Sequence, residues 1–413
     1  MKLCSYGESL REVLQEIKPS GVDAATLPAN REPSRFSILF SLPSMLLSDA
    51  GDQKECESRL RRYRSNFGSW TSLLADLGQQ APTVLSQDEL ETLDPAVTPY
   101  LILPLAQALS EAQLRAVVGF VQAGGQLIAD ALPGTYDSDG VPRADNPLAE
   151  LFGVRNAGSP VRGGVPAEFQ GRTLRVELAD PDLEAAGARA ALAGEPEILF
   201  VHDGHVLINV LPDLYRTVRG QIAVAEPVMA LFRQALAAAR VPEPWDIRLP
   251  SGTESARYRH GGNRYLGFTR PVGENDRSGV ANLGFDRKYY CYDLLQRQFV
   301  GQTDQLEFPL EKSAVRYFAL LPAPTRPYQL TLKRDGRGWK ATIANPGPDG
   351  IFRLEVSRPD GTVFKPATGN RLSESGSESE IVIDDGIEPR PGQWTVRLIN
   401  LLDNTATEEK IVF

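Results

Sequence analysis

Residues that could carry out chemistry are few in this sequence of 413 residues. The cysteines are far apart and show no C-x-x-C spacing, which favours neither a disulfide framework nor a zinc site: Cys4, Cys56 and Cys291. His202 and His205 flank an Asp-Gly turn with no third ligand at a useful spacing, so exposed turn residues are the better interpretation. Neither a G-x-S-x-G turn nor a glycine-rich phosphate loop is present. The sequence therefore predicts no catalytic residue, no metal and no cofactor.

Asp137 and Asp139 form the carboxylate pair of greatest interest, in the run Tyr136-Asp-Ser-Asp-Gly140. The run has the acid-plus-glycine character of a calcium loop, but the later ligands and the closing glutamate are missing. Glycoside hydrolysis requires two carboxylates about 5–10 Å apart, and nothing in the sequence distinguishes this pair from an ordinary turn. A place for Tyr136 and Asp137 in a ligand pocket is the better interpretation.

Short apolar runs alternate with helical patterns in the first half of the chain. We expect strands at residues 35–40, 83–85, 100–103 and 126–130. The helix after the third strand begins with a capping box formed by Ser110 and Gln113. This alternation predicts an α/β fold with a doubly wound, mostly parallel sheet and helices on both faces. A hairpin over residues 198–211 is expected to close the sheet edge, and a last helix to cover residues 226–240.

Ligands of such a sheet bind at the carboxyl ends of its strands. Here these ends are the expected turn Ser41-Leu-Pro-Ser44, the run Pro104-Leu-Ala-Gln107 and residues 130–137. The candidate ligand-binding residues are therefore Ser41, Ser44, Asp130, Tyr136 and Asp137.

The pattern changes after Pro242-Glu-Pro244 to short alternating strands separated by turns. His260-Gly-Gly-Asn263 predicts a hairpin. In the last segment, Phe352, Leu354 and Val356 point to one face, which is typical of a β-sandwich of immunoglobulin type. The expected organisation is an N-terminal helix and linker (1–34), an α/β domain (35–241), a small β domain (242–325) and an immunoglobulin-like β-sandwich (326–413).

The charge and hydropathy of the chain limit its partners. A net charge of -9 argues against nucleic acid, whose phosphates need clustered Lys and Arg. The sequence has no run of 18 or more apolar residues, and its N-terminus has no apolar signal core. We therefore expect no membrane span and a cytoplasmic location. Residues 6–17 predict a short amphipathic helix, which needs a partner to cover its apolar face.

Three runs resemble the trimerisation domain of family-42 β-galactosidases. They are Leu101-Ile-Leu-Pro-Leu-Ala-Gln-Ala-Leu-Ser110, Phe120-Val-Gln-Ala-Gly-Gly-Gln-Leu-Ile-Ala-Asp130 and Asn146-Pro-Leu-Ala-Glu-Leu-Phe-Gly153. Upstream, Ser37-Ile-Leu-Phe-Ser-Leu-Pro-Ser44 resembles the first strand of that domain, and Gly392-Gln-Trp-Thr-Val396 resembles β-sandwiches appended to relatives of these enzymes. The resemblance implies a flavodoxin-like fold similar to class I glutamine amidotransferases, without their chemistry.

The resemblance also sets the functional expectations. Family-42 enzymes carry two catalytic glutamates on a preceding (β/α)₈ barrel, which needs about 250 residues, and 34 residues precede the first expected strand here. The family's catalytic residues therefore have no positions to map onto. The resemblance implies a role in carbohydrate metabolism and a homo-oligomer, in particular a homotrimer.

Three hypotheses follow. The first is a non-catalytic assembly or accessory protein that pairs with a separate glycoside hydrolase subunit. The second is a carbohydrate-binding module that holds a sugar ligand in the strand-end crevice. The third is a degenerate glycoside hydrolase with weak activity, for which Asp137 and Asp139 are the residues to test.

Overall fold

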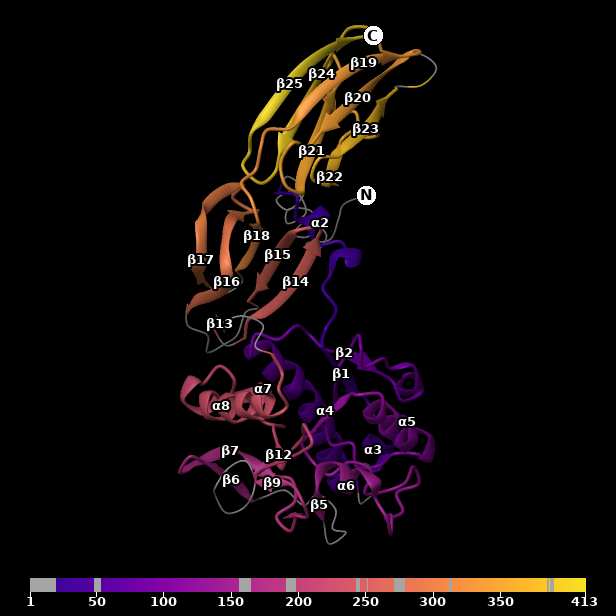
Figure 1. The fold of residues 1–413 in the computed structure, drawn as a ribbon, viewed down its shortest axis with the longest axis vertical. Coiled ribbons are helices and arrows are strands. Elements are labelled where there is room, and N and C mark those ends of the chain that lie inside the picture. The colour runs from indigo at the N-terminus through magenta and orange to yellow at the C-terminus, as the bar shows by residue number, and fades with distance from the viewer. Residues whose placement is uncertain are drawn as a thin grey trace. The chain divides into compact units, whose positions relative to one another are not determined.

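The computed structural model describes residues 20–47, 53–155, 165–190, 198–242, 246–250, 252–270, 279–311, 314–384, 386 and 390–413. These residues form two compact units, which are interleaved in the sequence (Figure 1). One, the α/β unit, holds residues 33–254 and 270–281. The other, the β unit, holds residues 20–32, 255–269 and 282–413. The division into four segments that the sequence suggests stays a prediction.

A seven-stranded sheet forms the centre of the α/β unit, in the order β2-β1-β3-β4-β11-β10-β9. The strands in this order are Thr83–Leu85, Phe36–Leu39, Tyr100–Leu103, Gln126–Ala129, His205–Ile208, Leu199–His202 and Arg189–Ala190. Pairing is parallel from β2 to β11 and antiparallel beyond it. The four strands expected in the first half of the chain and the mostly parallel sheet are thus confirmed.

Helices cover both faces of this sheet. They are α3 (Leu42–Leu47), α4 (Gln53–Asp76), η3 (Gln87–Thr92), α5 (Glu111–Gln122), α6 (Pro147–Phe152), α7 (Tyr215–Val218) and α8 (Ile222–Ala238). On one face Trp70 of α4 and Phe232 of α8 pack edge to face, with ring centroids 5.0 Å apart. On the other face Leu114 and Val117 of α5 pack with Phe152 of α6. Because both faces are covered, β1 and β3 are buried along their whole length, as continuous apolar strands of parallel sheets are.

Several expectations for this unit are wrong in detail. The segment Ser41–Ser44 is not a simple turn, because α3 begins within it. The hairpin β10–β11 forms as expected, but β9 pairs with its outer strand, so the hairpin is not the edge. The last helix begins at Ile222, four residues before its expected start.

Small strands complete the α/β unit; β12 lies within the hairpin expected over residues 198–211, and the sequence did not indicate the others. A three-stranded sheet has the order β12-β7-β6, and β5 pairs with β8. Their bounds, with those of β13, are Val210–Leu211 (β12), Arg172–Leu178 (β7), Pro166–Phe169 (β6), Val154–Arg155 (β5), Glu184–Ala185 (β8) and Asp246–Arg248 (β13). Asn209 separates β11 from β12, because its side chain bonds both the N–H and the carbonyl of Asp180 and turns the chain toward β7.

The β unit contains one sheet of long strands in the order β16-β18-β15-β14, with β17 also paired to β16. The bounds are Gly279–Asp293 (β16), Val315–Leu321 (β18), Asn263–Thr269 (β15), Glu254–His260 (β14) and Gln298–Leu310 (β17). The hairpin expected at His260–Asn263 is confirmed, since β14 ends and β15 begins there.

Two further sheets of the β unit enclose a core of their own. One has the order β19-β20-β23 and the other β22-β21-β24-β25. The strands are Gln329–Asp335 (β19), Gly338–Ala344 (β20), Gly350–Ser357 (β21), Gly369–Ser373 (β22), Glu378–Ile383 (β23), Gln393–Asn400 (β24) and Ala406–Val412 (β25). Phe352, Leu354 and Val356 all enter this core, which confirms their expected common face.

A short early helix belongs to the same unit. Helix α2 (Val22–Ala25) is followed by η2 (Pro28–Asn30). Val22 and Ala25 pack in a buried cluster with Ile351 and Leu401. The amphipathic helix expected over residues 6–17 lies outside the described residues. No helix within the described residues has the length and apolar character needed to cross a membrane.

Candidate functional site

Ser41 and Ser44 lie side by side where β1 ends and α3 begins. The Ser41 hydroxyl is 2.9 Å from that of Ser44 and 3.0 Å from the carbonyl oxygen of Ala108. The Ser44 hydroxyl also contacts this carbonyl and accepts the Ala108 N–H, each at 2.9 Å. Ser41 N–H donates to the Tyr63 hydroxyl at 2.7 Å. Both serines are buried, so their polar groups join α3 to the loop after β3.

Asp130 follows β4 and is completely buried. Its carboxylate accepts hydrogen bonds from Asn66 Nδ2 (2.5 Å) and Trp70 Nε1 (2.6 Å) of α4. It also accepts the backbone N–H of Leu105 at 2.6 Å. Burial raises the pKa of Asp130 to about 6, against the lowering effect of these donors. The carboxylate therefore ties α4 to the turn that follows β3.

Leu105 adopts a backbone conformation that is unusual for a leucine. Its φ angle is 46°, in the left-handed region, and its side chain is buried. Such a conformation persists in a non-glycine residue only where the surroundings hold it. The bond from the Leu105 N–H to Asp130 supplies part of that restraint.

Tyr136 and Asp137 shape the next loop. Tyr136 is buried, and its backbone N–H donates to the Gln107 carbonyl at 2.9 Å. The Asp137 carboxylate accepts the N–H groups of Asp139 and Val141, both at 2.9 Å, and so closes its own turn. Burial and the nearby carboxylate of Asp180 raise the pKa of Tyr136.

The structure thus brings together the loops that carry the five candidate residues, but not their polar groups in one open crevice. Four of the five side chains are buried and Asp137 is half-buried. Hydrogen bonds from protein groups occupy Ser41, Ser44 and the carboxylates of Asp130 and Asp137. A ligand-binding role for these residues stays a prediction.

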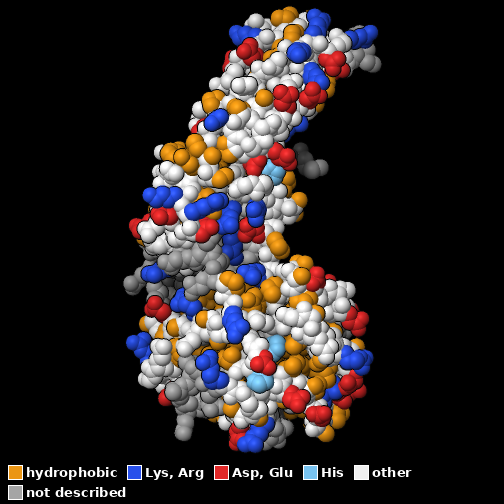
Figure 2. Space-filling view, in the orientation of Figure 1, with side chains coloured by type: hydrophobic (Ala, Val, Ile, Leu, Met, Phe, Trp, Pro, Cys, Tyr) orange, Lys and Arg blue, Asp and Glu red, His pale blue; other side chains and the backbone are white. Residues whose placement is uncertain are grey.

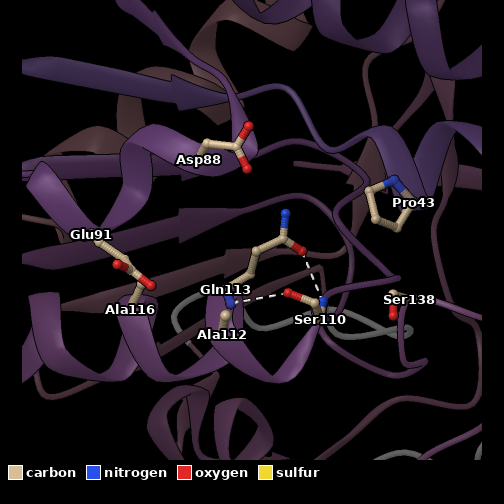
Figure 3. Close-up of a pocket in the computed structure, with 8 residues that line it drawn as sticks. All are labelled: Pro43, Asp88, Glu91, Ser110, Ala112, Gln113, Ala116 and Ser138. Atoms are coloured by element: carbon tan, nitrogen blue, oxygen red, sulfur yellow. Dashed lines mark hydrogen bonds between the residues drawn. The ribbon is translucent and has the colours of Figure 1, made fainter.

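A pocket with a volume of about 380 Å³ opens beside these loops (Figure 3). Its walls come from α3, η3, the first two turns of α5 and the turn after Asp137, and are formed by Pro43, Asp88, Glu91, Ser110, Ala112, Gln113, Ala116 and Ser138. The sequence did not single out Asp88 or Glu91. Ser110 and Gln113 were recognised only as the start of a helix, although a capping side chain also presents its free atoms to solvent at the helix end.

His205 and Cys291 are both buried among protein groups. His205 is buried, contrary to the expectation of an exposed turn residue, and its Nδ1 accepts the Leu127 N–H at 3.1 Å. Burial lowers the pKa of His205 and raises that of the Cys291 thiol to about 12, so both are neutral near pH 7. Among the residues that the structure describes, no three His, Cys, Asp or Glu side chains are grouped to hold a metal ion.

Basic and acidic side chains are interspersed on the face of the molecule that Figure 2 shows. Within the α/β unit, Arg62 forms an ion pair with Glu177, and Arg219 forms one with the buried Asp76. Mixed charge of this kind, with the net charge of -9, differs from the basic surface that phosphate recognition needs.

No protein-family model and no curated protein matches the sequence. Solved structures do resemble the fold. A β-galactosidase from Bacillus circulans sp. alkalophilus aligns with 76% of this chain and 44% of its own, at 13% identity and a TM-score of 0.50. A β-galactosidase from Rahnella sp. R3 aligns with 70% of this chain and 41% of its own (16% identity, TM-score 0.44). For α-L-fucosidase isoenzyme 2 from Paenibacillus thiaminolyticus the shares are 70% and 49% (11% identity, TM-score 0.40).

The chain thus spans less than half the length of each of these enzymes. At 13% identity, the likeness to the Bacillus circulans enzyme concerns the fold.

Proposed function

We propose that this chain is a non-catalytic assembly or accessory part of a β-galactosidase-like glycoside hydrolase system, acts in carbohydrate metabolism and mediates oligomerisation. The α/β unit has the role of a trimerisation domain in this proposal. Its parallel order β2-β1-β3-β4-β11 supports the flavodoxin-like, amidotransferase-like interpretation. The two sheets around the C-terminal core support an immunoglobulin-like sandwich.

The observation that carries the proposal is Leu105. In enzymes with a nucleophile on a strand-to-helix turn, a strained residue at the end of a central strand presents the reactive atom. Here the turn between β3 and α5 retains a strained residue, but that residue is a buried leucine held by Asp130. A hydrocarbon side chain has no nucleophilic atom, so in this proposal the turn has a structural role and not a catalytic one.

The fold similarity to the Bacillus circulans β-galactosidase supports the part of the proposal that concerns glycoside hydrolases. The fold similarity covers 76% of this chain and supports a place in a β-galactosidase-like system. The proposed partners are therefore further copies of this chain, three in the favoured assembly, and a separate glycoside hydrolase subunit.

Sedimentation velocity of the full chain over a wide concentration range tests the assembly role. We expect a species of three times the 45.2 kDa chain mass, and no hydrolysis of nitrophenyl glycosides by that species. A monomer at every concentration contradicts the oligomer. Hydrolysis that survives removal of both carboxylates by Asp137→Asn and Asp139→Asn contradicts a non-catalytic role and also excludes these two residues as its source.

A further inference from the structure

The pocket beside α5 carries polar groups that the fold does not use. It lies between η3, which bears Asp88 and Glu91, and the start of α5, which bears Gln113 (Figure 3). Its volume of about 380 Å³ is within the roughly 300–1,000 Å³ usual for small-molecule sites.

Gln113 supplies a hydrogen-bond donor whose direction is fixed. The side chain is only 5% exposed, and its Oε1 accepts the Ser110 N–H at 2.8 Å. Because an N–H can only donate, the oxygen must face Ser110, and the amide nitrogen must face the other way. Figure 3 shows this nitrogen directed into the pocket, toward the side where Asp88 lies. Within the described residues no acceptor contacts it, so this amide donor is available to a ligand in the pocket.

Asp88 and Glu91 supply acceptors on the opposite wall. Residues three apart on a 3₁₀-helix lie on the same face, so both carboxylates are presented together. Neither forms an ion pair or a hydrogen bond with another described side chain, and both border the pocket. Ala112 and Ala116 face them from α5, and these small side chains leave the space between the two walls open.

The arrangement selects for one kind of ligand chemistry. Two carboxylates repel an anion, and an ammonium group offers no lone pair to the Gln113 amide. Hydroxyl groups both donate and accept, so adjacent hydroxyls can donate to Asp88 and Glu91 while accepting from Gln113. Pro43 and the two alanines add an apolar surface for C–H groups.

We propose that this pocket binds an uncharged polyhydroxylated ligand of the size of a monosaccharide. In this proposal the Gln113 amide donates a hydrogen bond to one ligand hydroxyl, and Asp88 and Glu91 accept hydrogen bonds from others. The site differs from the buried residues Ser41, Ser44 and Asp130, and it does not depend on the assembly role.

Titration of the full chain with D-galactose, D-glucose, D-mannose and D-xylose, followed by calorimetry and saturation-transfer NMR, tests the proposal. We expect saturable binding of at least one of these sugars, little changed by added salt because the ligand is uncharged. Gln113→Glu keeps the capping oxygen for the Ser110 N–H but replaces the amide donor with a carboxylate oxygen. We expect it to weaken binding about tenfold or more, and the thermal midpoint is measured alongside to show that the variant is folded at the titration temperature.

Two further variants make the result decisive. Ala112→Leu places a larger side chain in the pocket at an exposed helix position and should abolish binding. Glu150→Gln changes an exposed acid of α6 that does not line the pocket, and should bind as the unchanged protein does. Flat titrations with all four sugars overturn the proposal. Binding that survives both Gln113→Glu and Ala112→Leu, or binding of spermidine without any sugar, also overturns it.

Discussion

Asp130 joins elements that are far apart in the sequence. It accepts hydrogen bonds from two side chains of α4 and from the backbone of Leu105, and no water-exposed surface remains on it. Three N–H donors around one carboxyl group favour its ionised form, whereas burial favours its neutral form. Burial has the larger effect, so the pKa of Asp130 is raised in the folded chain although the three hydrogen bonds lower it.

Asp130→Asn should therefore destabilise the α/β unit. An asparagine has one acceptor oxygen and an NH₂ group, which would face the N–H of Leu105 or Trp70. We expect a loss of about 1–3 kcal/mol in the free energy of unfolding, because at least one buried donor loses its partner. Urea unfolding at pH 4, followed by tryptophan fluorescence, measures this loss. An unchanged midpoint at that pH would show that the three hydrogen bonds contribute little.

The same residue predicts a dependence of stability on pH. The pKa of Asp130 is about 6 in the folded protein and near 3.8 when the chain is unfolded. The folded state therefore holds this proton to higher pH, and its contribution is complete below pH 3.8 and is lost as the pH rises through 6. The contribution of Asp130 to the free energy of unfolding changes by on the order of 3 kcal/mol over this range. The difference in stability between the unchanged protein and Asp130→Asn should shrink or reverse as the pH rises from 4 to 7, and a constant difference would contradict this pKa.

At the scale of elements, the loop after β3 is held by serines of α3. The Ser44 hydroxyl bonds both the N–H and the carbonyl of Ala108, and Ser41 shares that carbonyl. These contacts fix the path of the chain into α5, which begins two residues further on at its cap Ser110. The pocket wall formed by α5 thus depends on α3 as well as on its own capping box.

Ser44→Ala should cost about 1–3 kcal/mol of stability, because it leaves the buried N–H of Ala108 without its acceptor. Calorimetric unfolding provides the measurement. Ser138→Ala, an exposed serine on the rim of the same pocket, should change stability by less than about 0.5 kcal/mol. Equal effects of the two substitutions would refute a bridging role for Ser44.

Local signals made some of these elements predictable. The capping box of Ser110 and Gln113 involves neighbours in the sequence, and the structure contains both of its bonds. Strands β1, β3 and β4 were also predictable, because each is a short run of mostly apolar residues in the sequence. The side-chain partners of Asp130 lie 60 and 64 residues before it, and no local pattern reports such contacts. The serines were expected to face a ligand for the same reason: their acceptor, Ala108, is distant in the sequence.

At the scale of the whole molecule, each unit has its own hydrophobic core. Both buried clusters of the central sheet consist of residues between Phe36 and Val241. The C-terminal core of the β unit draws on residues from Tyr328 onward. Such self-contained cores are the usual mark of parts that fold independently.

A fragment of residues 33–254 should therefore fold without the rest of the chain. We expect a single cooperative heat transition and dispersed amide resonances, since the fragment keeps every member of both clusters. A fragment of residues 33–190, which lacks β10, β11 and α8, serves as the control and should not fold. If the longer fragment binds hydrophobic dyes and shows no transition, its core is incomplete.

The placement of α2 has a consequence for synthesis of the protein on the ribosome. Val22 and Ala25 pack against Ile351 and Leu401, yet the α/β unit is encoded between them. At about 5–20 residues per second, the ribosome needs roughly 20–75 s to reach Leu401 after it has made Ala25. The α/β unit can finish folding in that interval, before Ile351 and Leu401, which pack on the apolar side of α2, have been translated. Until β21 and the residues after β24 are made, this helix lacks Ile351 and Leu401, so its buried cluster is completed only near the end of translation.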